Sequence, residues 1–565
     1  MVDEFLHSQR IAYFSMEIAL TNAIPTYAGG LGILAGDTVR TAADLELPLV
    51  AVTLVSRMGY FRQELDAEGR QREFPDPWDP AGIATPLNAK VVVSLEGKRV
   101  WVSAWLYVVT GERAGRQPVI LLDTDLNENA PEDRQLTHSL YGGDQIYRLK
   151  QEVVLGVGGV RMLQALGFTI SEYHMNEGHS ALLAVELLRR FAFPPRDLQP
   201  GESSYDIPRV RELCNFTTHT PVEAGQDKFT YELVQRVFND DYIDYTTLKR
   251  LAGSDALNMT RLALNLSEYV NGVAERHAEV SRKMFPGYRV RAITNGVHPY
   301  TWTGASFARL YDHYLPGWCH EPELLLRADS AIPDAAVWEA HRQAKAALID
   351  RVRSLTGVSL NPKVPIIGFA RRMTEYKRPD LLFHDMARLK NIAQQWPFQL
   401  VMAGKAHPHD EGGKSLIAQI HVHLRELEGT IRGVFLPNYN MELALTLVSG
   451  VDLWLNTPLR PLEASGTSGM KAAFNGVPQL SVLDGWWIEG CIEGITGWAV
   501  GDSRESANGN DAYALYDKLE QTVLPLYYTD QTKWIGVMKG AVGKNASYFN
   551  SHRMMRRYAT EAYLR

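Results

Sequence analysis

The chain has 565 residues, of which 45% are hydrophobic, 22% charged and 10% aromatic. This composition is typical of a globular protein with large apolar cores and excludes a disordered or fibrous chain. Lysine and arginine number 58 against 65 aspartates and glutamates, so the formal charge is −7, which argues against a nucleic-acid binder. The three cysteines, Cys214, Cys319 and Cys491, are far apart, so we expect neither a disulfide framework nor a cysteine zinc site.

Targeting and membrane segments are not indicated by the sequence. The first ten residues, MVDEFLHSQR, are too charged for a signal peptide. The longest apolar stretch, residues 47–55, has the length of a strand and is far below the roughly 18 residues that a transmembrane helix needs. We therefore expect a soluble protein of the cytoplasm that does not bind membranes.

In the first half of the chain, short apolar runs alternate with amphipathic patterns. They predict strands at residues 11–16, 47–55 and 119–122, helices at 33–45 and 145–166, and a tight glycine turn at 29–32. Between residues 90 and 110 the period changes to two around Gly97, which predicts an antiparallel hairpin inserted as a flap on an α/β core.

The second half repeats this alternation. Strands are predicted at residues 364–370, 398–403, 451–455 and 479–483, and helices at 335–355, from 380, at 415–428 and through the C-terminus. Strands alternating with helices predict parallel sheets. The least periodic stretch, residues 296–333, is the expected boundary between two lobes. Ligands of open parallel sheets bind beyond the carboxyl ends of the strands, so two facing lobes would form one deep cleft.

The glycine-rich segment GGLGILAG at residues 29–36 lies between a predicted strand and a predicted helix. A dinucleotide fingerprint is disfavoured, because about ten residues separate the strand from the glycines and no acidic residue follows at the distance that a ribose requires. A purely structural turn stays open. The third interpretation is an anion site, since glycines let the backbone approach a ligand and a helix N-terminus favours negative charge.

Cations are concentrated in RRMTEYKR, residues 371–378, directly after a buried strand. A solvated charge cluster is one interpretation, but the carboxyl end of a strand favours a phosphate site, for which arginine forks and a lysine are suited. A second feature is Lys471, which stands among small and apolar residues in EASGTSGMKAAF. A desolvated lysine has a lowered pKa and is a candidate for Schiff-base chemistry.

These motifs resemble those of the α-glucan (glycogen, starch and maltodextrin) phosphorylases, of the short bacterial and archaeal type. The resemblance runs in order over nearly the whole chain, from IAYFSME to the last helices. It implies an α/β fold of two Rossmann-like lobes facing a deep central cleft, the GT-B glycosyltransferase architecture. The expected lobes are residues 1–296 and 297–540, with a helical segment at 541–565 that packs back on the first lobe.

The resemblance also implies a reaction. Inorganic phosphate would cleave terminal α-1,4-glucosidic bonds of glycogen or maltodextrin reversibly and release α-glucose 1-phosphate with retention. Pyridoxal 5′-phosphate would be bound covalently at Lys471, with its own phosphate as the acid–base partner of inorganic phosphate. A cytoplasmic homodimer is expected. The first strand begins near residue 11, so control through an N-terminal extension of the kind found in the animal enzymes is not expected.

The family's functional residues map onto this sequence by motif. Catalytic roles are implied for Lys471, Arg372, Lys377, His219 and Glu463. Cofactor contacts are implied for Lys471, Trp302, Tyr439, Gly469, Thr467 and Gly30. Substrate or phosphate contacts are implied for Gly29, Gly30, Leu31, Arg371, Arg372, Tyr376, Lys377, Asn295, His219, Glu463, Ala464, Ser465, Gly466, Glu177 and His179.

Three positions depart from the family pattern. Arg371 replaces a frequent lysine, Glu177 replaces an aspartate, and Asn440 stands where an arginine beside the cofactor phosphate is usual. The loss of that cation leaves open a glucan-binding homologue without catalysis. A nucleotide-sugar glucosyltransferase of the glycogen-synthase type is the rival enzyme, but it would not need Lys471. No metal is expected, since neither His407 with His409 nor His174 with His179 has a metal-binding spacing.

Overall fold

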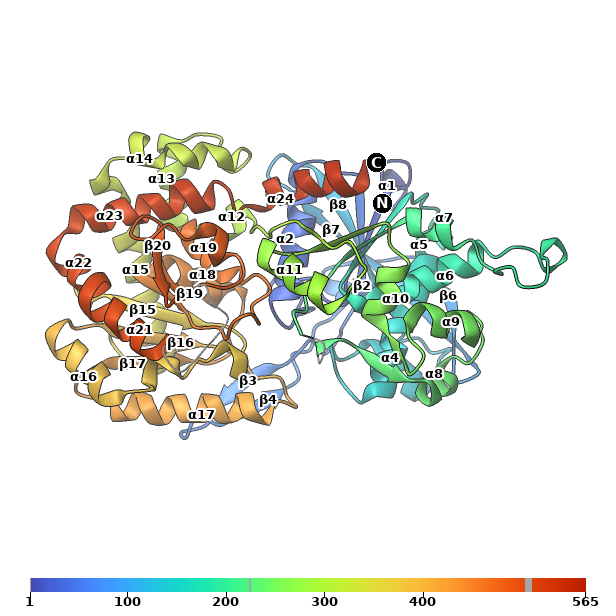
Figure 1. Cartoon of the computed structure of the whole chain (residues 1–565), viewed down its shortest axis with the longest axis horizontal. Coiled ribbons are helices and arrows are strands. Elements are labelled where there is room, and N and C mark those ends of the chain that lie inside the picture. The colour runs from blue at the N-terminus through green and yellow to red at the C-terminus, as the bar shows by residue number, and fades with distance from the viewer. Residues whose placement is uncertain (1, 223–224, 503–510, 565) are drawn as a thin grey trace.

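The computed structural model describes residues 2–222, 225–502 and 511–564. Its two large sheets lie side by side along the longest axis of the molecule, each with helices around it (Figure 1). The prediction of a mixed α/β fold with parallel sheets is confirmed. No helix in the described part of the chain is long and apolar enough to cross a membrane.

The first sheet has ten strands in the order β14-β13-β10-β9-β1-β2-β8-β7-β5, with β6 on β7. All neighbours from β14 to β8 are parallel. The strands are β1 Ile11–Phe14, β2 Leu49–Leu54, β5 Thr85–Pro86, β6 Val91–Leu95, β7 Lys98–Thr110, β8 Arg116–Asp123, β9 Glu172–Asn176, β10 Cys214–Thr217, β13 Tyr269–Gly272 and β14 Arg291–Ala292. β1 and β2 are buried along their whole length because helices cover both faces, as in other parallel sheets.

The second sheet has six parallel strands in the order β17-β16-β15-β18-β19-β20. They are β15 Ile366–Ala370, β16 Gln399–Ala403, β17 Arg432–Leu436, β18 Leu453–Asn456, β19 Gln479–Val482 and β20 Gly497–Val500. Four of these strands were predicted, whereas β17 and β20 were missed.

The predicted flap is wrong in its role. The hairpin of β6 and β7 exists and turns at Gly97, whose φ is +72°. However, the thirteen-residue β7 pairs antiparallel with β8 from Ser103↔Asp123 to Thr110↔Arg116, so the hairpin extends the main sheet. The reason is the length of β7: one end of the strand pairs with β6, while the other end pairs with β8 and β5.

The predicted glycine turn is also wrong. Gly29 is extended, and helix α2, Gly30–Asp44, starts at the next residue. Two of the glycines, Gly32 and Gly36, are needed for close packing instead. A methyl group at Gly36 would lie 2.1 Å from the backbone oxygen of Ala19, and one at Gly32 would lie 2.6 Å from Glu17 Oε2.

Other predicted helices are found with shifted bounds. The helix at 145–166 is α4 Gln145–Val153 and α5 Gly159–Ala165 joined by a π-helical turn, and the others are α15 Asp334–Thr356 and α17 Glu411–Glu426. The helix expected from residue 380 is wrong: a single turn at Leu381–Phe383 precedes α16, Met386–Gln395, because the carboxylate of Asp385 caps α16.

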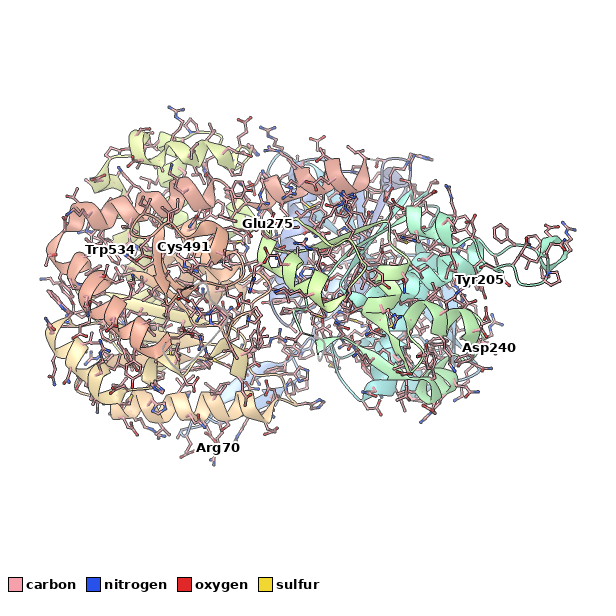
Figure 2. All side chains as sticks on the ribbon, in the orientation of Figure 1. Arg70, Tyr205, Asp240, Glu275, Cys491 and Trp534 are labelled. Carbon is pink, nitrogen blue, oxygen red and sulfur yellow. The ribbon has the colours of Figure 1, made fainter. Side chains whose placement is uncertain are left out.

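Several contacts join the two sheet regions. The hairpin of β3 Arg62–Leu65 and β4 Gln71–Phe74 extends from the first region to α17 (Figure 1). There Gln71 Nε2 donates to the backbone oxygen of Ala406 at 2.9 Å. Helix α11, Glu275–Met284, starts where the regions meet (Figure 2), and the backbone N–H of Glu275 donates to Glu489 Oε1 at 3.0 Å.

The chain ends on the first sheet. Helix α24, Ser551–Tyr558, packs against α2 (Figure 1). Met554, Met555 and Tyr558 share a buried cluster with Tyr13 and Leu34. The division of the chain into lobes at residues 296 and 540 stays a prediction.

Candidate active site

The strand orders of the two sheets place loops at two switch points. In the first sheet the chain proceeds from β1 to β2 on one side and continues later through β9 on the other. The second sheet does the same around β15, with β16 on one side and β18 on the other. Loops at the carboxyl ends of such strands form ligand sites. The loop after β1 carries Glu17 and leads to the glycines of α2, and the loop after β15 carries the cluster at residues 371–378.

Two of the clustered cations bind the carboxylate of Glu463, and a third, Arg378, pairs with Asp511 at 2.6 Å. Arg371 Nη2 lies 2.7 Å from Glu463 Oε2, and Lys377 Nζ lies 2.7 Å from both oxygens of Glu463. Burial alone would raise the pKa of Glu463, but the charges of Arg371 and Lys377 outweigh it and lower the pKa to about 2. Glu463 is therefore ionised at neutral pH. The sequence predicted Arg371, Lys377 and Glu463 for the site but not that they pair with one another.

Anion-binding capacity remains in the cluster. Arg371 Nε and Nη1 are buried and have no hydrogen-bond partner. Arg372 is exposed to solvent and makes no hydrogen bond or ion pair with any described residue. Although the side chain reaches solvent, the protein around the guanidinium displaces water and by itself lowers the pKa of Arg372, whereas Tyr376 and Glu17 raise it by more, so the net pKa is raised. Arg372, with its unpaired donors, and the neighbouring Arg371, with two, can therefore bind a phosphate in the bidentate manner typical of guanidinium groups.

A glutamate that the sequence analysis missed lies on the glycine segment. Glu17 Oε2 accepts hydrogen bonds from the backbone N–H groups of Ala28 at 2.5 Å and Gly29 at 3.1 Å. The remaining first-turn N–H groups, at Gly30 and Leu31, belong to the N-terminus of a fifteen-residue helix and have no intrahelical partner. The signal for Glu17 was its place directly after the first strand in IAYFSME.

Lys471 is buried on helix α19, Ser468–Ala473. Its Nζ lies 3.7 Å from the centre of the Trp302 ring and makes no hydrogen bond or ion pair with a described residue. Burial lowers the pKa of Lys471 to about 8, and the carboxylate of Asp37 opposes this effect. Asp37, which was not predicted, accepts a hydrogen bond of 2.8 Å from Trp302 Nε1. A buried amine with a lowered pKa is suited to condense with an aldehyde.

Small residues and unpaired polar atoms surround the start of α19. A methyl group at Gly469 would lie 1.4 Å from Gln479 Oε1 and 2.9 Å from the Trp486 ring, so a larger residue would displace Gln479. Both side-chain amide atoms of Gln479 and the hydroxyl of Ser465 are buried without a hydrogen-bond partner. Thr467 precedes the helix as its N-cap. Buried polar atoms are almost always hydrogen-bonded, so such a set indicates a place for a polar ligand.

The predicted cofactor residue Tyr439 lies beside the cation cluster. Burial and the neighbouring Tyr27 raise the pKa of Tyr439 well above its usual value, and Arg371 opposes them. The next residue, Asn440, caps α18, Met441–Gly450, through a 2.9 Å hydrogen bond from the backbone N–H of Leu443. The side chain at this departure from the family pattern therefore serves the helix.

A second group of predicted residues lies at the ends of β9 and β10. His219 Nε2 lies 2.7 Å from Asn176 Oδ1, whose amide nitrogen donates to Ser15, so His219 Nε2 carries the proton. Burial and neighbouring histidines lower the pKa of His219 to about 3, so the ring is neutral and Nδ1 is free to accept from a hydroxyl. The carboxylate of Glu177 accepts from the backbone N–H of His219 at 2.7 Å.

The other predicted sugar-site residues are buried or half-buried nearby. His179 Nε2 lies 3.3 Å from Asp227, its Nδ1 has no partner, and burial lowers its pKa to about 4. Asn295 is buried and its Oδ1 has no partner. Gly466 has a φ of +83°, which glycine adopts without strain, and thereby turns the chain between Glu463 and α19.

Among the described residues, Asp44, His298 and His552 form the one His/Asp group whose ligand atoms lie close enough to hold a metal. Both His298 Nε2, at 2.7 Å, and His552 Nε2, at 3.1 Å, approach Asp44 Oδ2. His298 Nδ1 accepts from the backbone N–H of Thr301, so Nε2 carries the proton. These hydrogen bonds explain why the three side chains lie together. They connect α24 and the segment after β14 to α2.

The chain is similar to curated proteins over nearly its whole length. A family model described as carbohydrate phosphorylase matches residues 226–496. Maltodextrin phosphorylase of Thermococcus litoralis is 37% identical over 98% of this chain and 70% of the relative. Glycogen phosphorylase of Aquifex aeolicus is 36% identical over 99% of this chain and 87% of the relative, and that of Mycobacterium tuberculosis is 36% identical over 98% and 70%. On these similarities, the chain belongs to the carbohydrate phosphorylase family.

Proposed function

We propose that this chain is an α-glucan phosphorylase, which cleaves terminal α-1,4-glucosidic bonds of maltodextrin or glycogen with inorganic phosphate, reversibly and with retention, and releases α-glucose 1-phosphate. The names of the relatives support the substrate class. The observation that carries the proposal is the buried amine of Lys471, which lies on the Trp302 ring and makes no hydrogen bond with a described residue. In the same chain, the loop after β15 holds an arginine, Arg371, with unpaired donors. A glucosyltransferase that uses a nucleotide sugar has no need for such an amine.

We also propose the GT-B arrangement, with Rossmann-like lobes at residues 1–296 and 297–540 facing a deep central cleft, and the segment 541–565 returning to the first lobe. The reversal of strand order at β1 and β15 supports it, as do the electrostatic interaction between Glu17 and Arg372 and the packing of α24 on α2. The homodimer and the cytoplasmic location stay predictions.

Pyridoxal phosphate fits the residues present. Lys471 supplies an amine for covalent attachment and Trp302 supplies a ring face, while Gly469 lets helix α19 pack closely against Gln479 and Trp486. Thr467, Tyr439 and Gly30 are the further proposed contacts. When bound, this cofactor supplies a phosphate group that acts as an acid–base partner for inorganic phosphate.

The chain's own cations have to keep two phosphates close together. Like charges a few ångströms apart repel strongly in a site of low dielectric constant. Arg372 has no hydrogen-bond or ion-pair partner among the described residues, and Arg371 Nε and Nη1 have none either. Lys377 Nζ lies 4.5 Å from the centre of the Tyr376 ring. We assign phosphate binding to these four residues, together with the backbone N–H groups at Gly30 and Leu31. The N–H of Gly29, which the sequence also suggests for phosphate, donates to Glu17 instead.

The sugar is assigned to residues from both sheets. Glu463, ionised and held by Arg371 and Lys377, can accept from a glucosyl hydroxyl, with residues 464–466 beside it. His219 presents Nδ1 as an acceptor and Asn295 presents an unpaired Oδ1. The carboxylate of Glu177 already accepts from protein donors, so its role is to position residues 218–220. His179 is the last residue that we assign to the sugar.

The decisive experiment is phosphate-dependent release of glucose 1-phosphate from maltodextrin by the purified protein, with Lys471→Ala as the control. We expect product only with wild type, phosphate and maltodextrin together. Glucan elongation from a nucleotide sugar without phosphate would identify the rival glucosyltransferase. Binding of maltodextrin without any product would identify a non-catalytic homologue.

A further inference from the structure

The carboxylate of Glu17 occupies an unusual position. It is buried, and it accepts hydrogen bonds from the N–H groups of Ala28 and Gly29, immediately before the N-terminus of α2. A helix N-terminus favours an anion, so a fixed protein carboxylate here is the first anion that the segment binds. Gly32 makes this possible, because a methyl group there would lie 2.6 Å from Glu17 Oε2.

A tyrosine from a different segment holds this carboxylate. Tyr141 Oη donates to Glu17 Oε1 at 3.0 Å. The backbone of Tyr141 has a φ of +56°, in the left-handed region that is strained for a bulky side chain. Such strain persists where the surroundings over-determine the conformation, and it is frequent at functional sites. The hydroxyl is therefore placed on Glu17 at an energetic cost.

The ring of Tyr141 is fixed in turn. The guanidinium of Arg148 lies over it at 4.4 Å from the ring centre, and the ring of His179 meets it edge-on at 5.8 Å. Arg148 is itself held by ion pairs of 2.8 Å to Asp227 and 3.1 Å to Glu152. Tyr141 thus connects the residues assigned to the sugar with the glycine segment assigned to phosphate.

Glu17 is also among the carboxylates that act on the unpaired Arg372. The two groups interact electrostatically, although no ion pair forms between them. Arg372 makes no hydrogen bond or ion pair with a described residue. Both oxygens of Glu17 are engaged by N–H and O–H donors, so this carboxylate acts on Arg372 through its charge without pairing with it.

We propose that Glu17 is a positioning residue for phosphate and that Tyr141 holds it in place. Glu17 fixes the N–H groups of Ala28 and Gly29 on its own oxygen, which leaves those of Gly30 and Leu31 for the substrate phosphate. This inference rests on the proposed phosphorylase function and adds two residues to it. It predicts a defect specific to phosphate-bearing ligands.

The test uses the holoenzyme and the variants Tyr141→Phe and Glu17→Gln. Tyr141→Phe removes one hydrogen bond and keeps the ring beneath Arg148, so we expect the KM for phosphate and for glucose 1-phosphate to rise about five- to tenfold. Glu17→Gln should raise them at least as much. The KM for maltodextrin, the cofactor absorbance and the melting temperature should stay those of wild type.

Tyr528→Phe is the matched control, because its hydroxyl donates to the backbone oxygen of Pro397 at 2.6 Å, in the second sheet region. It should leave every constant unchanged. Phosphate KM values within twofold of wild type in both Tyr141→Phe and Glu17→Gln would overturn the proposal, as would an equal rise in the KM for maltodextrin. Calorimetric titration with inorganic phosphate tests the same step without turnover. If the wild type releases no glucose 1-phosphate, the proposed function fails, while an unequal phosphate affinity of the variants would still support the role of Glu17.

Discussion

The lowered pKa of Lys471 makes cofactor uptake dependent on pH in a calculable way. Burial shifts this pKa from 10.5 to about 8. At pH 7.5 about a quarter of the amines are then neutral, whereas for a pKa of 10.5 the neutral fraction is roughly one in a thousand. Only the neutral amine is a nucleophile. The buried site should therefore gain a factor of roughly 200 in reactive amine near neutral pH.

The assay is the rate at which cofactor-free protein takes up pyridoxal phosphate, followed by absorbance between about pH 6 and 10. The rate should rise about tenfold per pH unit and level off above about pH 8. A blocked free lysine, measured with the same cofactor, corrects for ionisation of the cofactor and should keep rising toward about pH 10. In Asp37→Asn the plateau should begin at lower pH, because Asp37 raises the pKa of Lys471.

A rate for the wild type that still rises above pH 9 would show that Lys471 titrates like an exposed lysine and would refute the argument from burial. Lys471→Ala should lose both cofactor absorbance and phosphorolysis. Retention of either property in that variant would refute the assignment of Lys471.

Three further predictions concern the rest of the site. Arg372→Ala should raise the KM for phosphate about 10- to 100-fold, with the KM for maltodextrin unchanged in steady-state assays, because a charge-assisted hydrogen bond is lost; equal effects on both constants would contradict the assignment. Gly469→Ala should abolish cofactor absorbance, since its methyl group would lie 1.4 Å from Gln479 Oε1, whereas Gly536→Ala, which meets nothing within 4 Å, should be tolerated. Glu463, with its pKa lowered from 4.5 to about 2, should contribute about 3 kcal/mol of stability above pH 4.5 that is lost as the pH falls toward 2. Urea unfolding of wild type and Glu463→Gln at pH 7 and pH 3 should show this difference shrink, and a constant difference would contradict the pairing.

Much of the fold could be predicted because parallel sheets have a strong local signature. A strand buried on both faces is a nearly continuous apolar run, as in residues 366–370, and this pattern survives without any knowledge of its neighbours. Elements without such a run, such as β17 and β20, were missed. The pairing of strands could not be predicted either. The period-two pattern of β7 predicts a strand, but it does not show that this strand pairs with both β6 and β8.

The sequence by itself determined the class of fold and the family resemblance, and it predicted the residues to which the chemistry is assigned, since these depend on local pattern and motif order. Only the tertiary structure decided how those residues meet. It set Lys471 on Trp302, 169 positions away in the chain, paired Glu463 with Arg371 and Lys377, and placed Glu17 on the glycine segment. The physical reason is that charge pairing, burial and the resulting pKa values depend on distances through space, which spacing along the chain does not contain.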